Sequence, residues 1–483
     1  MNFVSLEFLI FALLAVVVLR LPIPFINRDL RLLGLNTAFV ASYFSAPDKI
    51  LPVMGFVLLG YAALFAGRLR FPAILATLVA AVTLLFVWLK QYTLVTALSP
   101  QHLGNFAFAT VGLSYILFRV LHVLIDTQQG SMKRPSFLRY LNYCFFFPNF
   151  VSGPIQRYDD FTAQVARPMP PLTPHILHAA LGRIILGIFM TLVISAAALK
   201  LGHVLQNLYY VHAAMPHHYA HKALYLGAAA AVYLVNLFAN FAGYMHIVIG
   251  VGKICGFDIP ENFNKPYLAK NFLDLWARWH ITLSDWFKFY LFNPLLKYMA
   301  QKWDNPHLTP YLGAIAFFVT FLIMGVWHGT TILFVIYGGF LGLAAMVNKA
   351  WQIFMAQKLG RKGYKDLAQR NWYFQISRAL TLGYFAVSLI CLWLDPTKLP
   401  VGHGWRIVPE TIGSLLLVTL AFTVLGGVID KILLPVASRL IPSATQPPSE
   451  GRMIITMALK LVAIIYILLV MGDSAPEFIY KAF

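Results

Sequence analysis

The chain repeatedly forms apolar runs long enough to cross a lipid bilayer, and no other feature constrains its fold as strongly. These runs occupy twelve windows: 4–19, 32–46, 50–66, 71–89, 105–125, 176–198, 223–250, 311–327, 331–350, 377–395, 412–435 and 454–472. A transmembrane helix needs about 20 mainly apolar residues, and a backbone within lipid must satisfy its own polar groups. The sequence therefore predicts an all-α polytopic membrane protein with about twelve transmembrane helices, some tilted or partial, together with re-entrant or interfacial helices.

The composition excludes a soluble globular chain. Hydrophobic residues make up 59% of the 483 residues and charged residues only 11%, whereas a soluble domain carries about 25% charged residues. The net charge of +19 lies in short basic clusters between the apolar runs, which is typical of cytoplasmic loops that face anionic lipid head groups. We therefore expect membrane lipid as a partner, and no nucleic acid.

Basic clusters predict the orientation of the chain in the membrane. They follow the first, third and fifth apolar windows: Arg20, Arg28 and Arg31, then Arg68 and Arg70, then Lys133 and Arg134. Basic loops resist translocation, so these connections are expected on the cytoplasmic side. Alternation of the windows then predicts that both termini are extracytoplasmic and that the basic stretch 349–370 is cytoplasmic.

The segment 140–161 is apolar but broken by Pro148, Gly153 and Pro154. A broken backbone can lie at membrane depth only where protein or a water-filled cavity satisfies the freed polar groups. We expect a re-entrant or bent helix that lines a cavity. The alternative is a simple interfacial loop.

Cysteine and histidine usage predicts no metal site. The three cysteines are scattered through apolar segments without the close spacing of zinc ligands: Cys144, Cys255 and Cys391. The stretch 199–222 contains five histidines, but no carboxylate or cysteine accompanies them: His203, His212, His217, His218 and His221. Histidine-rich interfacial loops are commonly just solvated, so we expect no bound metal.

The most polar part of the membrane region is the tryptophan-rich stretch 271–331. Its first half interleaves charged and aromatic side chains, which is typical of a helix at the membrane interface. Asp274 and Arg278 have the i,i+4 spacing of a helical ion pair. We therefore expect His280 on a helix that dips into the membrane from the cytoplasmic side.

A second histidine, His328, follows the apolar span 311–327 and is expected near the outer face. A neutral imidazole, whose usual pKa is about 6.5, can take a proton from a hydroxyl and return it to a leaving group. Trp327 would supply an apolar wall, and Gly329 would allow close approach of a substrate. The alternative is a structural histidine between helices.

Two histidines approached from opposite sides suit the transfer of a group across the membrane. A long polar donor arm would leave its amides unpaired in lipid, at a cost of several kcal/mol each. We therefore expect a central tunnel that joins His280 to His328, lined by 140–161, 270–290 and the start of 331–350.

A series of motifs carries a resemblance to a known family: Phe147-Pro148, Ser152-Gly153-Pro154-Ile155, Phe241-Ala242-Gly243-Tyr244, Asn262-Phe263-Asn264, Arg278-Trp279-His280-Ile281 and Met324-Gly325-Val326-Trp327-His328-Gly329. Together they resemble the membrane-bound O-acyltransferase (MBOAT) family, and most of all its bacterial branches that modify cell-surface polymers. The resemblance covers about residues 105–350, within a single integral membrane domain 1–483 whose peripheral helices occupy 1–104 and 377–483.

The resemblance implies an O-acyltransferase in the cytoplasmic (inner) membrane of a bacterium. His328 would be its essential catalytic residue, and His280 matches the other recurrent polar position. The candidate substrate-binding residues surround them in the sequence: Trp327, Gly329, Trp279, Arg278, Asp285, Ser284 and Asn264.

The implied reaction needs no bound cofactor. An acyl thioester donor, acyl-CoA or an acyl carrier protein, would reach the enzyme from the cytoplasm. A periplasmic or surface acyltransferase partner and a glycopolymer acceptor would lie outside.

Two branches of the family compete for the acyl group. The segment 347–351 and the Ser152 and Phe241 motifs are similar to the teichoic-acid D-alanyl transferase branch, whereas the length and the tail 476–480 are more similar to the alginate-type O-acetylation branch. The chain departs from the family pattern at Asp285 before Trp286 and at Met245-His246. These departures concern donor or partner specificity more than the reaction class.

Other functions stay open from the sequence. A polytopic transporter or flippase would use the histidines as proton relays, although we find no inverted repeat. A lipid-modifying acyltransferase would take a long-chain donor from the bilayer. The spacing from His280 to Asp285 also matches the HxxxxD pattern of glycerol-phosphate acyltransferases, but a pattern with so few fixed positions arises easily by chance.

Overall fold

The computed structural model describes residues 3–21, 25–44, 50–66, 72–90, 92, 112–303, 305, 308–400, 402–428 and 450–471. Within these ranges the regular elements are helices, apart from one isolated bridge between Phe263 and Trp279. The all-α prediction is therefore confirmed for the described part of the chain. Arg68, Arg70, the first seven residues of the window 105–125 and the tail 476–480 lie outside the described residues.

The helices follow one another from the N-terminal region to the long central helix as α1 Leu6–Arg20, α2 Arg28–Ala41, α3 Leu51–Ala66, α4 Pro72–Lys90, α6 Leu113–Gln128, α7 Phe137–Cys144, α8 Tyr158–Ala166, α9 Pro174–Phe189, α10 Ala196–Ala213 and α11 Tyr219–Ile254. The second half contains α12 Phe272–Trp276, α13 Ile281–Phe287, α14 Asn293–Lys302, α15 Thr309–His328, α16 Ile332–Gln369, α17 Asn371–Ser388, α18 Ile390–Trp393, α19 Ile407–Val428 and α21 Glu450–Met471. Short 3-10 or π turns lie between or beside them at Phe147–Asn149, Met190–Ser195, Pro266–Leu268, Lys288–Phe292, Pro396–Lys398 and Gly404–Arg406.

Eight helices in the described ranges are long and apolar enough to cross a membrane, and each overlaps a predicted window. The other four windows correspond to α1, α2, α3 and α6, which have only 14 to 16 residues each. At about 1.5 Å per residue, such helices are shorter than the hydrocarbon core of about 30 Å. The prediction of a polytopic membrane protein is confirmed, with eight candidate spans in the described ranges.

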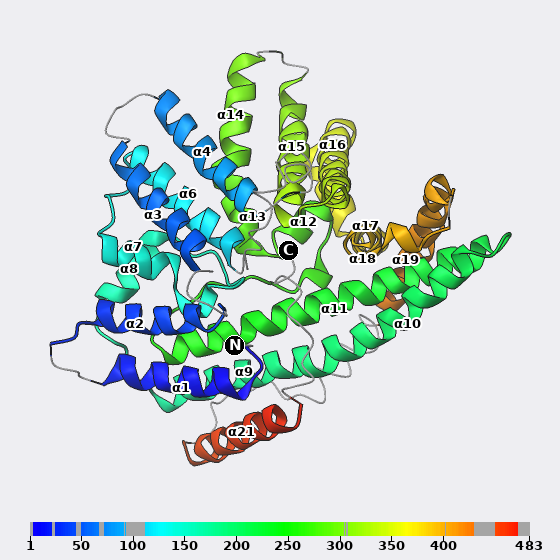
Figure 1. Cartoon of the computed structure of the whole chain (residues 1–483). Helices are drawn as coiled ribbons and strands as arrows, with labels where there is room; N and C mark the ends of the chain where they lie inside the picture. Colours follow the sequence, from blue (N-terminus) through cyan, green and yellow to red (C-terminus); the bar gives the residue numbers. More distant parts are fainter. Residues whose placement is uncertain are drawn as a thin grey trace.

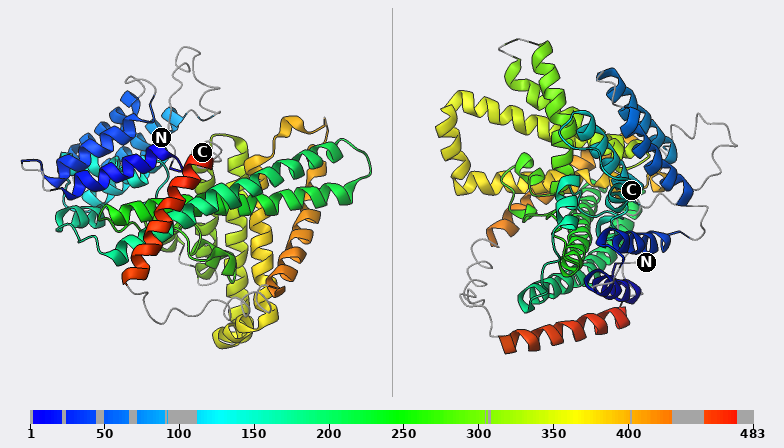
Figure 2. Two further views of the ribbon diagram at one scale, coloured as in Figure 1. Left: turned by 90° about the horizontal axis from the view of Figure 1, so that it is seen from below. Right: turned by 90° about the vertical axis from the view of Figure 1, so that its left-hand side faces the viewer.

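A long helical hairpin organises the molecule. α9 and α10 run almost continuously through a π turn at Met190–Ser195, and α11 returns beside both of them (Figures 1 and 2). α17 and α19 pack on α11 as well. α11 is therefore the common support for the helices that precede and follow the polar stretch 271–331.

A second hairpin, α15 and α16, carries His328 at its closed end. The two helices cross so closely at Gly325 that a Cβ atom built there would lie 2.3 Å from the Cα atom of Gly338. Only glycine fits at such a crossing, which resembles the small-residue contacts common between membrane helices. The crossing fixes the last turn of α15 against α16.

The broken segment 140–161 consists of the end of α7, a 3-10 turn and an irregular stretch that leads into α8. Its freed carbonyl groups are satisfied by Arg119, a fully buried side chain of α6. The guanidinium donates to the carbonyl oxygens of Tyr143, Cys144 and Asn149 at 2.6 to 2.9 Å. Protein groups thus meet the requirement for a broken backbone at membrane depth.

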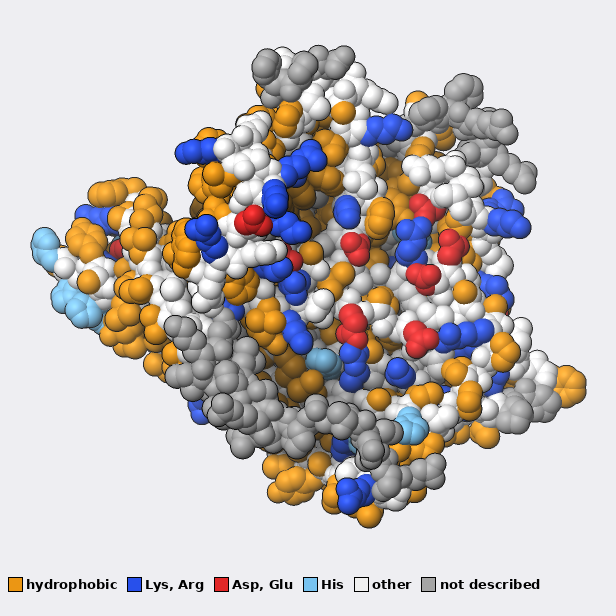
Figure 3. Space-filling model, turned by 180° about the vertical axis from the view of Figure 1, so that it is seen from behind, with side chains coloured by type: hydrophobic (Ala, Val, Ile, Leu, Met, Phe, Trp, Pro, Cys, Tyr) orange, Lys and Arg blue, Asp and Glu red, His pale blue; other side chains and the backbone are white. Residues whose placement is uncertain are grey.

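The surface is mostly apolar, with charges concentrated in limited areas. On the face opposite to that of Figure 1, basic and acidic side chains gather over one central region, while the projecting parts are largely hydrophobic (Figure 3). Lipid would cover the hydrophobic parts in a membrane protein.

Candidate active site

His280 lies in a strained turn between α12 and α13. Its φ of 47° and ψ of 52° are left-handed, a conformation that costs a residue other than glycine about 1–3 kcal/mol. The predicted continuous helix through His280 is therefore wrong, because the chain breaks at 277–280 and His280 precedes the first residue of α13. The predicted ion pair forms, with Asp274 and Arg278 3.1 Å apart.

Asn262 stabilises this turn from a neighbouring segment. Its backbone oxygen accepts from Ile281 N–H at 3.0 Å, and its Oδ1 accepts from the N–H and hydroxyl of Thr282 at 3.0 and 2.9 Å. The Thr282 hydroxyl also accepts from Ile155 N–H at 2.9 Å, which connects the turn to the broken segment. The surroundings therefore over-determine the conformation of His280.

The His280 side chain is almost completely buried, with 1% of its surface exposed. The ring of Phe241 packs edge-on against it at 4.8 Å, and the Tyr115 hydroxyl lies 3.4 Å from its Nε2. Burial lowers the pKa of His280 well below its usual value, and the nearby His328 lowers it further. Burial therefore favours the neutral form of the His280 imidazole.

His328 is the last residue of α15 and is 5% exposed. Its ring contacts those of Trp327 and Tyr337, with centroids 4.8 and 5.9 Å away. Trp327 in turn packs edge-on against Tyr115 at 5.8 Å. Tyr115 therefore lies between His280 and the Trp327-His328 pair, and the structure brings the two predicted histidines into one buried site.

Gly329 follows His328 in extended conformation. A Cβ atom built on it would lie 2.1 Å from the ring of Phe334. Close packing therefore requires glycine beside His328. The sequence led us to expect a substrate close to Gly329, whereas the group that packs there is the ring of Phe334.

The remaining predicted site residues are distributed over three places. Trp279 lines an apolar cavity of about 280 Å³ between α11, α17 and α19. Arg278 pairs with Asp274, and the exposed Asn264 contacts residue 278 through its backbone N–H. Ser284 donates to the carbonyl of Trp279 at 3.4 Å.

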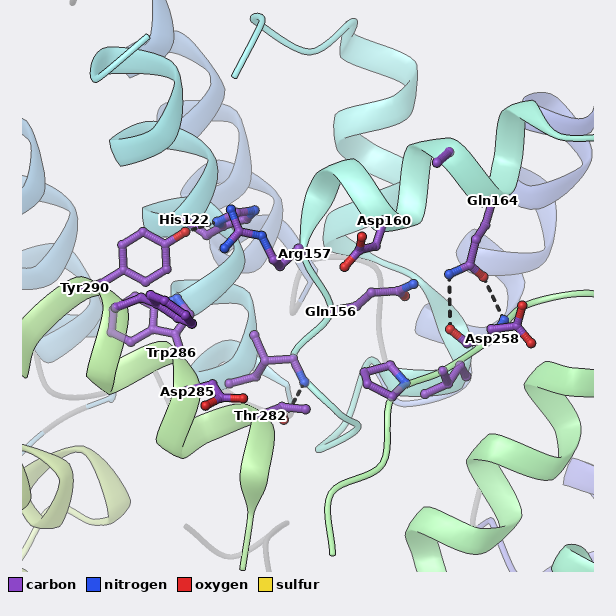
Figure 4. Close-up of a pocket in the computed structure, with 15 residues that line it drawn as sticks. His122, Gln156, Arg157, Asp160, Gln164, Asp258, Thr282, Asp285, Trp286 and Tyr290 are labelled. Carbon is purple, nitrogen blue, oxygen red and sulfur yellow. Dashed lines mark hydrogen bonds between the residues drawn. The ribbon is translucent and has the colours of Figure 1, made fainter. Parts of the chain in front are cut away.

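Asp285 lines a different and more polar cavity of about 580 Å³ (Figure 4). Its walls come from the broken segment and α8 on one side and from α13 on the other, as predicted for 140–161. The polar lining side chains are His122, Gln156, Arg157, Asp160, Gln164, Asp258, Thr282, Asp285 and Tyr290. Thr282 connects this cavity to the His280 turn.

Gln156 is the unusual member of this lining. Its side chain is only 4% exposed, and neither its amide oxygen nor its amide nitrogen has a hydrogen-bond partner in the described structure. Figure 4 shows it extending from the broken segment beside Asp160. A buried amide without a partner is costly, which indicates that the cavity accepts a group with both a donor and an acceptor.

A hydrogen-bond network fixes the wall of the cavity nearest α6. Tyr158 N–H donates to His122 Nε2 at 3.0 Å, and His122 Nδ1 lies 3.2 Å from Asp126. The Tyr290 hydroxyl donates to the same carboxylate at 3.0 Å, and Arg157 lies 3.3 Å from it. The network therefore joins α6, α8 and the π turn after α13.

Sequence reasoning missed four of these residues. Asn262 lies in the motif Asn262-Phe263-Asn264, but the sequence assigned it no structural role. Tyr115 gave no signal, because an aromatic residue in an apolar window is not distinguishable from a packing residue. Arg119 is a charged residue inside an apolar window, which is a signal that was overlooked. Gln156 follows the prolines and glycine of the broken segment, where a single amide does not stand out. Among the described residues, no group of three or more His, Cys, Asp or Glu side chains could hold a metal ion.

The sequence model of the membrane-bound O-acyltransferase family matches residues 58–387 of the chain. The chain belongs to this family. It is thus an O-acyltransferase and a multi-pass integral membrane protein, as the motifs had implied. The matched region is wider than the 105–350 expected from the motifs and includes both histidines and Tyr115.

Curated MBOAT relatives act on cell-envelope polymers. The teichoic acid D-alanyltransferase of Bacillus subtilis is 29% identical over 298 residues, which cover 59% of this chain and 69% of the relative. The enzyme of the same name from Streptococcus thermophilus is 27% identical over 60% of this chain and 68% of its own length. The probable alginate O-acetylase AlgI of Pseudomonas syringae is 28% identical over 50% of this chain, but the match spans only 43% of its own length.

Proposed function

We propose that the protein transfers a small acyl group, acetyl or D-alanyl, from a cytoplasmic thioester donor to hydroxyl groups of an extracytoplasmic polysaccharide or glycopolymer. The transfer is direct or passes through a periplasmic or surface partner protein. The names of the relatives support the acceptor class, since they act on teichoic acid or alginate. Membership of the MBOAT family favours an acyltransferase over the transporter and flippase alternatives.

The observation that carries the proposal is the buried site that contains His280, Tyr115, Trp327 and His328. A neutral imidazole shielded from water is suited to general-base work, because it accepts a proton only when a substrate hydroxyl arrives. His328 takes this role in the proposal. Its position at a helix end, against the ring of Trp327, exposes it more readily to an acceptor than the fully enclosed His280.

The proposed reaction is an acyl transfer without a cofactor. The acceptor hydroxyl oxygen attacks the thioester carbonyl carbon while His328 takes the hydroxyl proton. The new C–O bond forms, the C–S bond breaks, and the imidazolium returns the proton to the thiolate. In this proposal His280 and the Tyr115 hydroxyl, which lie 3.4 Å apart, contact the acyl group or orient the base.

The polar cavity beside Asp285 is the proposed entrance for the donor. The arm that carries the thioester in acyl-CoA and in acyl carrier proteins is long, thin and rich in amides. The unpartnered Gln156 amide supplies a donor and an acceptor for such a group. Thr282 and Asn262 then connect the cavity to His280. The tunnel from His280 to His328 stays a prediction.

The proposal is tested by measuring the ester-linked acyl groups on envelope polymer with and without the gene. The gene is deleted in its host and restored on a plasmid, envelope polymer is treated with mild alkali, and the released acids are identified by mass spectrometry. We expect acetate or D-alanine esters in the restored strain that are absent from the deletion strain. Equal amounts of both esters in the two strains would overturn the proposal.

A further inference from the structure

The last turn of α15 receives two hydrogen bonds, one from Lys90 at the end of α4 and one from Tyr92, two residues beyond it. Lys90 donates from Nζ to the backbone oxygen of Trp327 at 2.6 Å, and the Tyr92 hydroxyl donates to the backbone oxygen of Val326 at 2.9 Å. The last four carbonyl groups of an α-helix have no partner within the helix. These two side chains therefore satisfy consecutive carbonyls directly before His328.

The Lys90 ammonium is surrounded by aromatic rings. The centroids of Phe86, Tyr92 and Trp327 lie 5.7, 5.8 and 5.9 Å from its Nζ. Aromatic faces attract a cation. In the described part of the chain no carboxylate forms an ion pair with Lys90, so its contacts are these rings and the carbonyl at the end of α15.

The charge of the Lys90 ammonium and its hydrogen bond to the Trp327 carbonyl both stabilise the C-terminal end of α15. A cation is stabilised at a helix C-terminus, where the partial charge is negative, and an ammonium donates a stronger hydrogen bond than a neutral group. The last turn of α15 also contacts α6, because the Trp327 indole donates to the backbone oxygen of Ser114 at 3.4 Å. The turn is thus attached to α4 and α6 at once.

We propose that Lys90 and Tyr92 are positioning residues that fix the orientation of His328 for the acyl-transfer step. The inference rests on the proposed function, because it matters only if His328 is the base. Neither residue needs to contact a substrate. A loss of either contact would let the last turn of α15 move, and a small misplacement of reacting groups costs about 100-fold in rate.

The test uses inside-out membrane vesicles of the restored strain, sealed with isolated envelope polymer inside them as the acceptor. The probes are the pantetheine thioesters of acetate and of D-alanine, and the rate is measured as labelled acyl transfer over a range of probe concentrations. The variants are Lys90→Met, Lys90→Arg and Tyr92→Phe. Lys200→Gln, which removes an exposed lysine of α10, serves as the matched charge control.

We expect Lys90→Met to lower kcat by about 10- to 100-fold and to change KM by less than about threefold, since binding is not affected. Lys90→Arg keeps the charge and the donor, so it should recover most of the rate. Tyr92→Phe should lower kcat by about 3- to 10-fold, which corresponds to one hydrogen bond. Lys200→Gln should behave as wild type.

Wild-type kcat in Tyr92→Phe and Lys90→Met would overturn the inference. If Lys90→Met fails to reach the membrane, Tyr92→Phe decides alone, because loss of a single hydroxyl is compatible with folding. Inactivity of His328→Ala together with full activity of the α4 variants would contradict this inference and leave the proposed function intact. Activity of His328→Ala would contradict the proposed function itself.

Discussion

The hydroxyl of Tyr115 lies 3.4 Å from Nε2 of His280. The same tyrosine packs against Trp327, whose neighbour His328 ends α15. Two histidines that lie 48 positions apart in the sequence, before α13 and at the end of α15, therefore belong to one buried cluster. The cluster lies where the His280 turn, α6 and the α15–α16 hairpin meet.

Asn262 should be essential for the shape of this cluster. Asn262→Ala would leave the buried N–H and hydroxyl of Thr282 without their acceptor and would release the left-handed turn at His280. We expect a loss of about 2–4 kcal/mol in the free energy of unfolding, seen as a lower thermal midpoint of the protein in detergent. Asn264→Ala, on the exposed surface nearby, should change the midpoint little. Equal midpoints for the two variants would contradict this role.

The sequence predicted the class of fold and the two central histidines. Apolar windows are a strong signal because lipid permits few alternatives to helices, and all eight long helices in the described ranges overlap such windows. Histidine within an apolar region is also rare enough to indicate a site. The break in 140–161 was also predictable, because its prolines and glycine interrupt a helix within an otherwise apolar segment.

The shape of the site was not predictable in the same way. The His280 turn depends on Asn262, a contact between separate segments, so local helical spacing at Asp274 and Arg278 suggested a helix that continued too far. Trp279 was expected at the site because it precedes His280, but its side chain lines a separate apolar cavity. Tertiary contacts decided both outcomes.

Gln156 should contribute to donor binding. Gln156→Leu keeps the size of the side chain but removes the amide, so we expect KM for the pantetheine thioester to rise about tenfold while kcat changes less than threefold. Gln164→Leu should have a smaller effect, because the Gln164 amide is already paired with the backbone of Asp258. The measurement is acyl transfer in inside-out vesicles. An unchanged KM in Gln156→Leu would exclude the cavity as the donor entrance.

A buried cluster of polar and charged side chains around Glu410 of α19 should stabilise the fold. Glu410 Oε2 accepts from the Tyr209 hydroxyl at 2.9 Å and lies 3.1 Å from His403, and Lys222 lies 3.9 Å from Oε1. Glu410→Leu would leave a buried lysine charge without its partner, which costs about 3–5 kcal/mol. The thermal midpoint in detergent should fall, and the double variant Lys222→Met with Glu410→Leu should recover much of it. A wild-type midpoint in Glu410→Leu would show that the cluster contributes nothing.

The orientation of the chain can be tested by cysteine labelling. In a variant without the native cysteines, Lys133→Cys and Lys362→Cys should be protected from an impermeant thiol reagent in whole cells, because basic loops stay in the cytoplasm. His217→Cys, in the connection before α11, should react. Reaction at the first two positions and protection at the third would reverse the orientation.

The central claim is that His328 performs the acyl transfer, and the ester content of envelope polymer in His328→Ala cells tests it most directly. Removal of a general base lowers the rate by about 10²- to 10⁴-fold, while an alanine at the end of α15 should not block membrane insertion. We expect wild-type amounts of protein in the membrane and no acetate or D-alanine ester above the level of the deletion strain. Ester levels equal to those of the wild type, at equal protein levels, would contradict the account.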